Sequence, residues 1–332
     1  MLKKAMIMSA GIGTRLEPLT LSIPKPLIPL ANIPVMDYSL INLSNNGLKD
    51  VIANLYYLSD QIIERYSNKQ LYGVNFNYIK EEVLSGTAGG VKKCQFFFDE
   101  NEDFIVLSGD GLTDFELKEA YESHKKSGAI ATMVVKEIDR SEISKYGVVV
   151  TDENNAIVQF QEKPKLEEAL SNLINTGIYI FKYEIFNLIP PDTFFDFAKN
   201  VFPIMLERKL KINTFTTKRY WSDIGSLSQY KASNCDVLNS ALTLSKYLLG
   251  DIKNGCVSAS DVSGIELEGN CSIGHNCTFG KNVRIENSIL LNNISVSDNV
   301  IIRNSIIASG NRITENTENT VIGTKQEAKI LA

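Results

Sequence analysis

The sequence has few of the residues that enzymes use for proton transfer and few of the patterns that mark metal or disulfide sites. Among its 332 residues are two histidines, His124 and His275, and five cysteines with no C-x-x-C pair. An odd number of cysteines without such spacing argues against both a disulfide framework and a zinc site. The thiols are therefore expected to be buried.

Long apolar runs and basic tracts are also missing. Residues 5–8 are too short for a signal peptide, which needs roughly 7 to 15 apolar residues. Nowhere do about 20 apolar residues follow one another, as a membrane-spanning helix requires. The 34 basic and 39 acidic residues give a net charge of −5, with no basic tract that could neutralise a row of phosphates. These absences predict a cytoplasmic protein without a membrane or nucleic acid partner.

The first two thirds of the chain alternate between short apolar segments and amphipathic ones. Strands are expected at residues 4–9, 50–55, 75–79, 104–107, 129–135 and 147–150, and helices at residues 37–46, 60–66, 87–97 and 117–126. This order is typical of a doubly wound α/β sheet. Because single cores stop growing near 250 to 300 residues, a second domain is expected.

The C-terminal region repeats every six residues. Apolar residues stand at this spacing at Leu267, Ile273, Phe279 and Ile285. The spacing signals a left-handed parallel β-helix, and Gly274, Gly280 and nearby asparagines suit corners that can require positive φ. The register slips after Ile289, so roughly two coils are expected, fewer than the usual three repeats. The predicted parts are residues 1–230, a helical connection at residues 231–254 and a β-helix at residues 255–332, which should lean on the rest of the chain or on another subunit.

The loop after the first predicted strand carries Gly11 and Gly13, where the chain must turn and expose backbone N–H groups. Such a loop can hold a phosphate. It fits neither the dinucleotide fingerprint, which needs a glycine where Leu16 stands, nor a Walker A loop. Two glycines alone would also suit an ordinary tight turn. The loop becomes informative through the charges that follow, Arg15 and Lys25.

The run G-x-G-T-R-L-x-P-L-T at residues 11–20, with Ile-Pro-Lys-Pro-Leu at residues 23–27, resembles the signature of the sugar 1-phosphate nucleotidyltransferase family. Further matches follow in order at residues 86–89, 107–110, 144–149, 160–164, 175–179, 201–205 and 221–225. The resemblance covers the first 230 residues. It implies a Rossmann-like nucleotidyltransferase domain with a mixed, mainly parallel sheet, and the six-residue repeat is similar to members with a C-terminal left-handed β-helix.

The resemblance also implies a reaction. A sugar 1-phosphate oxygen attacks the α-phosphorus of a nucleoside triphosphate in line, and pyrophosphate leaves. The nucleophile is already ionised, because a phosphate monoester has a second pKa of about 6. No general base is required, so the scarcity of histidine is no objection. The reaction needs charge neutralisation and alignment instead.

The site residues implied by the resemblance have side chains that suit these needs. Asp110 and Asp223 would bind one Mg²⁺ that also contacts phosphates. Arg15 would grip the β- and γ-phosphates, Lys25 the reacting phosphoryl group and Lys163 the sugar phosphate. The nucleotide is expected at Ala10, Gly11, Gly13, Thr14, Glu81, Gly86 and Thr87, and the sugar at Gly147, Glu162, Asn175 and Thr176. Taken singly, these residues also suit capping aspartates, solvated cations or, at residues 175–177, a turn.

Three positions depart from the family pattern, and none of them is charged. Ser9 replaces the usual alanine or glycine before the glycine loop, and Ser85 replaces a common leucine before Gly86. Gly111 stands where a larger residue usually follows the metal aspartate. These departures could bear on base choice or on loop mobility.

The closest resemblance is to mannose 1-phosphate guanylyltransferases, which implies GTP and mannose 1-phosphate as substrates and GDP-mannose as product. Enzymes making UDP-, dTDP- or ADP-glucose remain an alternative, since specificity rests on a few pocket contacts. A non-catalytic regulatory paralogue that binds a sugar nucleotide is a second alternative, although all five charged site residues are present. An acyltransferase with His275 as base is a third. A homo-oligomer is expected, because β-helix sides often mediate closed assemblies.

Overall fold

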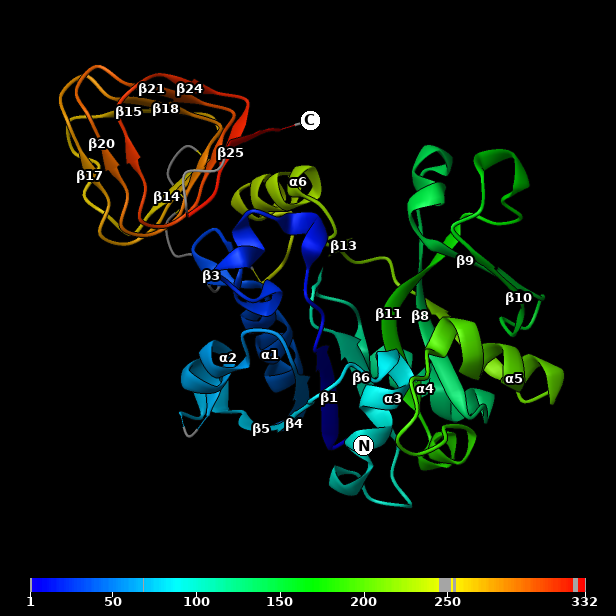
Figure 1. The fold of residues 1–332 in the computed structure, drawn as a ribbon. Helices are drawn as coiled ribbons and strands as arrows, with labels where there is room; N and C mark the ends of the chain where they lie inside the picture. The colour runs from blue at the N-terminus through cyan, green and yellow to red at the C-terminus, as the bar shows by residue number, and fades with distance from the viewer. Residues whose placement is uncertain (1, 68, 245–251, 253–254, 325–327, 332) are drawn as a thin grey trace. The chain divides into compact units, whose positions relative to one another are not determined.

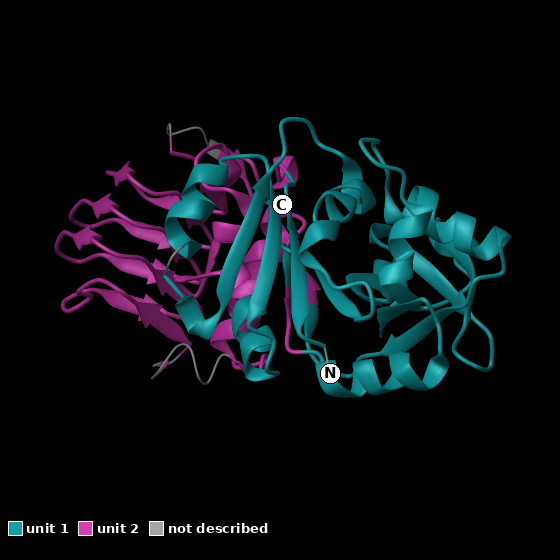
Figure 2. Ribbon diagram, turned by 90° about the horizontal axis from the view of Figure 1, so that it is seen from below, with its two compact units in different colours: residues 1–11, 39–111, 115–221 teal, residues 12–38, 112–114, 222–332 magenta. Residues whose placement is uncertain are grey.

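The computed structural model describes residues 2–67, 69–244, 252, 255–324 and 328–331. The contacts among its residues divide the chain into two compact units, coloured separately in Figure 2. Unit 1 comprises residues 1–11, 39–111 and 115–221, and unit 2 comprises residues 12–38, 112–114 and 222–332. The glycine-loop signature thus belongs with the C-terminal region and not with the strand that precedes it.

Unit 1 is built on a mixed sheet that has nine strands among the described residues. The strand order is β10-β9-β11-β6-β1-β4-β5, and β8 pairs with both β11 and β12. The bounds are β1 (Lys4–Ser9), β4 (Asp50–Leu55), β5 (Asn75–Lys80), β6 (Phe104–Ser108), β8 (Ala131–Glu137), β9 (Gly147–Thr151), β10 (Ile157–Glu162), β11 (Leu173–Phe181) and β12 (Ile212–Thr216). The Rossmann-like, mixed α/β fold predicted from the sequence is confirmed.

The strands β5, β4, β1 and β6 are parallel, so their carboxyl ends meet at one edge of the sheet. In open α/β sheets ligands bind at that edge. Ala10 follows β1, Tyr56 follows β4, Glu81 follows β5 and Gly109 follows β6. Of these residues, Ala10 and Glu81 belong to the predicted site. Beyond β6 the direction changes, because β11 runs antiparallel to β6, β8 and β9.

The helices agree closely with the sequence pattern. Their bounds are α1 (Val35–Asn45), α2 (Ser59–Tyr66), α3 (Gly86–Lys93), α4 (Leu117–Ser127), α5 (Phe202–Glu207) and α6 (Leu227–Leu238). The predicted helix at residues 87–97 is shorter, because the backbone N–H of Cys94 bonds to the carbonyl of Val91 and a 3₁₀ turn follows at Gln95–Phe97. No helix in the described ranges is long and apolar enough to cross a membrane.

The core of unit 1 is rich in aromatic rings. Phe104 on β6 stacks on Phe98 at 4.1 Å and on Phe186 at 5.2 Å between ring centroids. Each such pair stabilises by about 0.5 to 1.5 kcal/mol beyond the burial of its area. These rings fix β6, the strand that leads to Asp110.

The C-terminal part of unit 2 is a left-handed parallel β-helix, seen as a triangular coil in Figure 1. Its three described sides have the orders β14-β16-β19-β22-β25-β26, β15-β18-β21-β24 and β17-β20-β23, all parallel except β25 with β26. The bounds are β14 (Cys256–Ser258), β15 (Glu266–Glu268), β16 (Cys271–Ile273), β17 (Thr278–Phe279), β18 (Arg284–Glu286), β19 (Ile289–Leu290), β20 (Ser295–Val296), β21 (Ile301–Arg303), β22 (Ile306–Ile307), β23 (Arg312–Ile313), β24 (Thr317–Glu318), β25 (Thr320–Ile322) and β26 (Ala328–Ile330).

The β-helix has more coils than the sequence pattern predicted. Paired residues on neighbouring coils, such as Ile289 with Ile306 or Ser295 with Arg312, are 17 residues apart. Three sides of six residues would give 18, so one side of such a coil contributes five residues and not six. The core residues follow the same spacing of six, six and five residues, at Ile273, Phe279, Ile285, Leu290, Val296, Ile302, Ile307 and Ile313. The slip after Ile289 is this short side. The prediction of roughly two coils was wrong, because five parallel strands stack on one described side.

Most of the left-handed corner residues are asparagines, and Gly269 and Gly310 adopt the same backbone at other corners. Asn276, Asn282, Asn293 and Asn299 have φ between 56 and 60°. Gly274 and its equivalent Gly280 are needed for another reason. A Cβ on Gly274 would lie 2.4 Å from Asn292 Oδ1, and one on Gly280 would lie 2.2 Å from Asp298 Oδ1.

Within unit 2 the β-helix packs on the N-terminal segment of the same unit. The hairpin of β2 (Pro29–Leu30) and β3 (Ile33–Pro34) presents Asn32, whose Nδ2 donates to the carbonyl of Ile273 at 2.7 Å. Ser272 Oγ donates to Asn32 Oδ1 at 3.2 Å. Helix α6 supports the same hairpin through Tyr230 Oη, which donates to the carbonyl of Pro29 at 2.7 Å. Residues 245–251 and 253–254 of the predicted helical connection lie outside the described residues.

Candidate active site

The glycine loop in unit 2 is held in one conformation by its own residues. Gly13 has φ +77°, and its carbonyl accepts hydrogen bonds from Leu16 N and Thr20 Oγ1, both at 2.9 Å. A Cβ on Gly13 would lie 3.1 Å from Thr20 Cγ2 and 3.2 Å from Lys25 Cβ. Glycine is therefore required here by both backbone angle and space. The stem of Lys25 packs against this glycine, and the residue is 9% exposed.

Arg15 and Asp223, also in unit 2, come together above Gly225. Arg15 lies in the 3₁₀ turn Thr14–Leu16, and Asp223 ends β13 (Trp221–Asp223). A Cβ built on Gly225 would lie 2.9 Å from Asp223 Oδ2 and 3.2 Å from Arg15 Nη1. The guanidinium and the carboxylate thus flank one point of the backbone. A cation and an anion so placed can serve a phosphate and its metal together.

Asp110, in unit 1, is positioned by tight packing at the end of β6. A Cβ on Gly109 would lie 2.7 Å from both Met8 O and Ser9 Oγ, and Gly109 N donates to Met8 O at 2.9 Å. The end of β6 is thereby fixed to the end of β1. Ser108 Oγ donates to Asp110 Oδ1, which orients the half-buried carboxylate.

The residues predicted for the sugar lie on unit 1. The segment at residues 175–177 is a bulge inside β11, where the register shifts between Asn175 and Ile178, and not a turn between elements. Asn175 Oδ1 accepts from Gly177 N at 2.9 Å, and its Nδ2 donates to Tyr179 Oη at 2.9 Å. Burial raises the pKa of Tyr179, so its phenol stays protonated. Thr176 is buried, and its hydroxyl donates to the carbonyl of Val134 at 2.6 Å.

Gly147 and Glu162 face each other on β9 and β10. A Cβ on Gly147 would lie 3.4 Å from Glu162 Oε2, so the two predicted sugar-binding positions are adjacent. The next residue, Lys163, has φ +46° and precedes Pro164. A lysine in the left-handed region costs free energy, and a following proline disfavours helical backbone further.

The residues predicted for the base are held in unit 1 by side chains. Gly86 has φ +79°, and a Cβ there would lie 2.5 Å from Phe195 O. Thr87 Oγ1 donates to Asp196 Oδ2 at 2.8 Å and accepts from Phe197 N at 2.9 Å. Asp196 was missed by sequence reasoning, since no motif marks it. The side chain of Glu81 is fully buried. The contact with the nucleotide base that the resemblance implies for it stays a prediction.

The two predicted metal ligands lie in different units, Asp110 in unit 1 and Asp223 in unit 2. Both Asp110 and Asp223 are half-buried. Asp110 directly precedes β7 (Gly111–Thr113), and β7 pairs with β13. In the described part of the chain no three His, Cys, Asp or Glu side chains cluster as a closed metal site would require. Mg²⁺ usually takes one or two carboxylates and completes its shell with water and phosphate oxygens, so a half-buried aspartate such as each of these is a suitable ligand.

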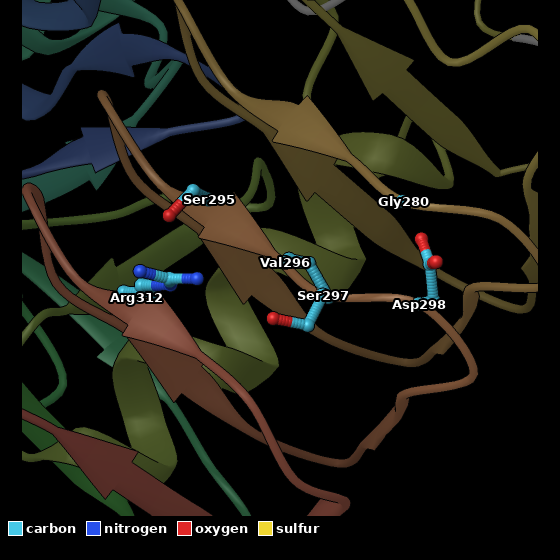
Figure 3. A pocket seen from close by; sticks show the side chains of 6 residues that line it. All are labelled: Gly280, Ser295, Val296, Ser297, Asp298 and Arg312. Carbon is cyan, nitrogen blue, oxygen red and sulfur yellow. The ribbon is translucent and has the colours of Figure 1, made fainter.

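The β-helix carries a hollow of about 550 Å³ on the outer face of β20 and β23, lined by Ser295, Ser297, Asp298 and Arg312 among others (Figure 3). The residues predicted for the site lie elsewhere in the chain. His275 stands at a coil corner, where its backbone N–H bonds to Asn292 Oδ1 at 2.8 Å. The backbone of His275 therefore helps to hold two neighbouring coils together.

Known families match almost the whole chain. Residues 4–240 match the Nucleotidyl transferase family, and residues 252–329 match the GMPPB C-terminal domain. The UTP–glucose-1-phosphate uridylyltransferase of Synechocystis is 37% identical over 287 residues, which cover 82% of this chain and 74% of that protein. The mannose-1-phosphate guanyltransferase of Saccharomyces cerevisiae is 35% identical over 241 residues, 71% of this chain and 65% of that protein.

Solved structures show the same fold. HddC from Yersinia pseudotuberculosis superposes with a TM-score of 0.61 and 26% identity over 70% of this chain and 98% of its own. A UDP-glucose pyrophosphorylase complexed with UDP-glucose gives a TM-score of 0.60 at 24% identity over 70% and 97% of the two chains. The family match over residues 4–240 and the similarity to these relatives show that the chain belongs to the sugar 1-phosphate nucleotidyltransferase family and is a nucleotidyltransferase.

Proposed function

We propose that this enzyme joins GTP and mannose 1-phosphate to give GDP-mannose and pyrophosphate. The observation that carries the reaction type is that the side chains of Arg15 and Asp223 both lie close to the backbone of Gly225. The choice of sugar nucleotide is supported by the match of residues 252–329 to the GMPPB C-terminal domain and by the yeast relative. The Synechocystis relative favours a second candidate, UTP with glucose 1-phosphate.

In the proposed reaction an oxygen of the sugar phosphate forms a bond to the α-phosphorus of the nucleotide. The bond from that phosphorus to the oxygen bridging toward the β-phosphorus breaks, and pyrophosphate leaves with the electron pair. No proton has to be moved, since the attacking oxygen is already ionised near neutral pH. The protein's task is to align two anionic substrates and to neutralise their charge.

Arg15 and Lys25 are proposed to hold the leaving pyrophosphate and the reacting phosphoryl group. The exposed guanidinium of Arg15 can bond two phosphate oxygens at once. Lys25 is buried, with its stem against Gly13, so its charge acts where solvent screens it less. Bound at Asp110 and Asp223, Mg²⁺ would supply further positive charge to the phosphates.

Lys163 is proposed to bind the phosphate of the incoming sugar, and Glu162 to accept hydrogen bonds from its hydroxyls. The adjacency of Glu162, which directly precedes Lys163, and Gly147 supports this assignment. Asn175 has its amide engaged with Tyr179 and Gly177, which fixes the bulge that borders these residues. Thr176 contributes through its backbone, because its hydroxyl bonds to Val134.

Pyrophosphate release measured over a panel of nucleoside triphosphates and sugar 1-phosphates tests the proposal. GTP with mannose 1-phosphate should give the highest kcat/KM, and UTP with glucose 1-phosphate giving the highest value would replace it by the second candidate. Asp110→Asn and Asp223→Asn should each lower kcat by about 100-fold or more without unfolding the protein, as the loss of a main electrostatic contact does. Near-normal turnover of either variant would overturn the metal assignment.

A further inference from the structure

The carboxylate of Glu81, at the end of β5, accepts hydrogen bonds from three other residues. Its Oε1 accepts from Asn54 Nδ2 at 2.7 Å. Its Oε2 accepts from Ser85 N and from Lys93 Nζ, both at 3.1 Å, and from the hydroxyl of Ser85. A carboxylate has about four acceptor positions, so these four donors use nearly its full capacity.

The same hydrogen-bond network reaches β1, the strand that precedes the glycine loop. Asn54 is the next-to-last residue of β4, and its Oδ1 accepts from Ser9 N, in the last residue of β1, at 3.1 Å. One buried acid therefore joins the carboxyl ends of β1, β4 and β5 to the start of α3. The helix comes close because a Cβ on Gly90 would lie 2.4 Å from Asn54 Nδ2.

The turn before α3 is fixed from its other side by residue 195. The carbonyl of Ser85 accepts from Phe195 N at 2.8 Å, and the carbonyl of Phe195 accepts from Ala88 N at 2.9 Å and from Gly89 N at 3.0 Å. The turn at residues 85–87, which the family pattern assigns to the nucleotide base, is thus clamped between Glu81 and Phe195.

Solvent does not reach Glu81. Its side chain is 0% exposed, while that of its ion-pair partner Lys93 is 32% exposed. A buried carboxylate is tolerated only when charge and hydrogen bonds compensate it, and here they do. A base edge could touch this carboxylate only if Ser85 moved away.

We propose that Glu81 is a positioning residue for the nucleotide-binding turn, with Ser85 as its clasp, and that it does not contact the base. This inference rests on the proposed function. A turn that is held in place discriminates between bases, because a poorly matched base leaves buried polar groups unpaired. Ser85, the departure from the family pattern noted above, is the residue that closes this clasp.

Ser85→Ala, Glu81→Gln and the double variant test the inference, with Ser127→Ala as a matched control. Ser127 likewise donates its hydroxyl to a nearby oxygen of unit 1, the backbone carbonyl of His124 at 2.8 Å, but it ends α4. The readouts are KM for each substrate, the kcat/KM ratio between GTP and UTP, the melting temperature and amide hydrogen exchange of residues 83–90.

Ser85→Ala should raise KM for the nucleotide by about fivefold, the value of one hydrogen bond of about 1 kcal/mol. Glu81→Gln should raise it by about 10-fold or more, since its bonds are charge-assisted. Both variants should lower the ratio of kcat/KM for GTP to kcat/KM for UTP, and amide hydrogen exchange at residues 83–90 should become faster. KM for the sugar phosphate should stay as in Ser127→Ala.

Two results would overturn the inference. If Glu81→Gln changes base preference while Ser85→Ala changes nothing and exchange is unaltered, Glu81 contacts the base directly. If both KM values rise together and exchange speeds throughout unit 1, the network is merely structural. A wild-type protein that releases no pyrophosphate from any substrate pair would defeat the proposed function alone, because GTP binding and exchange at residues 83–90 still test the positioning role.

Discussion

At Gly225 the backbone runs so close to two proposed site residues that a methyl group would displace one of them. The added Cβ of Gly225→Ala would lie 2.9 Å from Asp223 Oδ2 and 3.2 Å from Arg15 Nη1. A shift of about 1 Å in an aligned group can cost 100-fold in rate, so kcat/KM should fall by roughly 10- to 100-fold. Steady-state pyrophosphate release measures the loss.

Gly274→Ala is the matched control, because its clash lies inside the β-helix. The new Cβ would meet Asn292 Oδ1 at 2.4 Å and the backbone of Leu291 at 2.8 Å. Overpacking of this kind costs about 1 to 3 kcal/mol of unfolding free energy. The control should melt at a lower temperature yet keep kcat below that temperature, whereas equal effects of both variants would remove the special role of Gly225.

The buried thiols predict how stability depends on pH. Burial raises the pKa of Cys94 and of Cys271 to about 12, whereas an unfolded cysteine titrates near 8.5. The unfolded chain therefore loses these protons first. The stabilisation is complete below pH about 8.5 and falls above it by up to about 1.4 kcal/mol per pH unit for each thiol. Urea unfolding between pH 8 and 9.5 should show this fall, and it should be shallower in Cys94→Ala.

Candidate site residues could be named from the sequence where a motif contains them, whereas contacts that depend on packing could not. Arg15, Lys25 and Asp223 stand in matched runs, and the structure brings Arg15 and Asp223 together. The burial of Glu81 could not be foreseen, because its partners Asn54 and Lys93 depend on the register of β4 with β5 and on the position of α3. The spacing of residues along the sequence gives neither the strand register nor the position of the helix.

Among the elements, the asparagine corners give the clearest prediction. Asn299 has φ +60°, and its Oδ1 accepts from Asn282 Nδ2 at 3.0 Å. Alanine and glycine both remove that bond, but only alanine suffers in the left-handed region, by about 1 to 2 kcal/mol. Asn299→Ala should therefore be less stable than Asn299→Gly by that amount in chemical unfolding. At Asn316, whose φ lies outside this region, the order should reverse.

Strands were predictable when they were buried and regular. The expected bounds of β1 and β4 agree with the structure, because both are continuous apolar runs in a parallel sheet. Strand β10 has mostly exposed or half-exposed residues, and β11 is interrupted by a bulge, so neither shows a clean period. In the β-helix the five-residue side broke the six-residue pattern and hid the later coils.

For the whole molecule, the grouping of residues 12–38 with residues 222–332 predicts that the β-helix supports catalysis. A chain ending at residue 254 keeps all five proposed catalytic residues but loses Ser272 and Ile273, the partners of Asn32. We expect it to lose at least about 10-fold in kcat/KM, because the loop carrying Arg15 and Lys25 is less well aligned.

Asn32→Ala in the full chain separates local support from gross unfolding. It should show a smaller loss in the same direction, with a melting temperature close to that of the wild type. Full activity of the shortened chain would show that the loop holds its shape without the β-helix.

The division of the signature loop from its partners also sets the order of events during synthesis. Residues 12–38 leave the ribosome early, yet the rest of their unit begins at residue 222 apart from residues 112–114. At about 5 to 20 residues per second, the intervening stretch takes roughly 10 to 40 s to translate. The first motif of the proposed site to be made is therefore among the last to be completed, because its unit is whole only when the final coils have emerged.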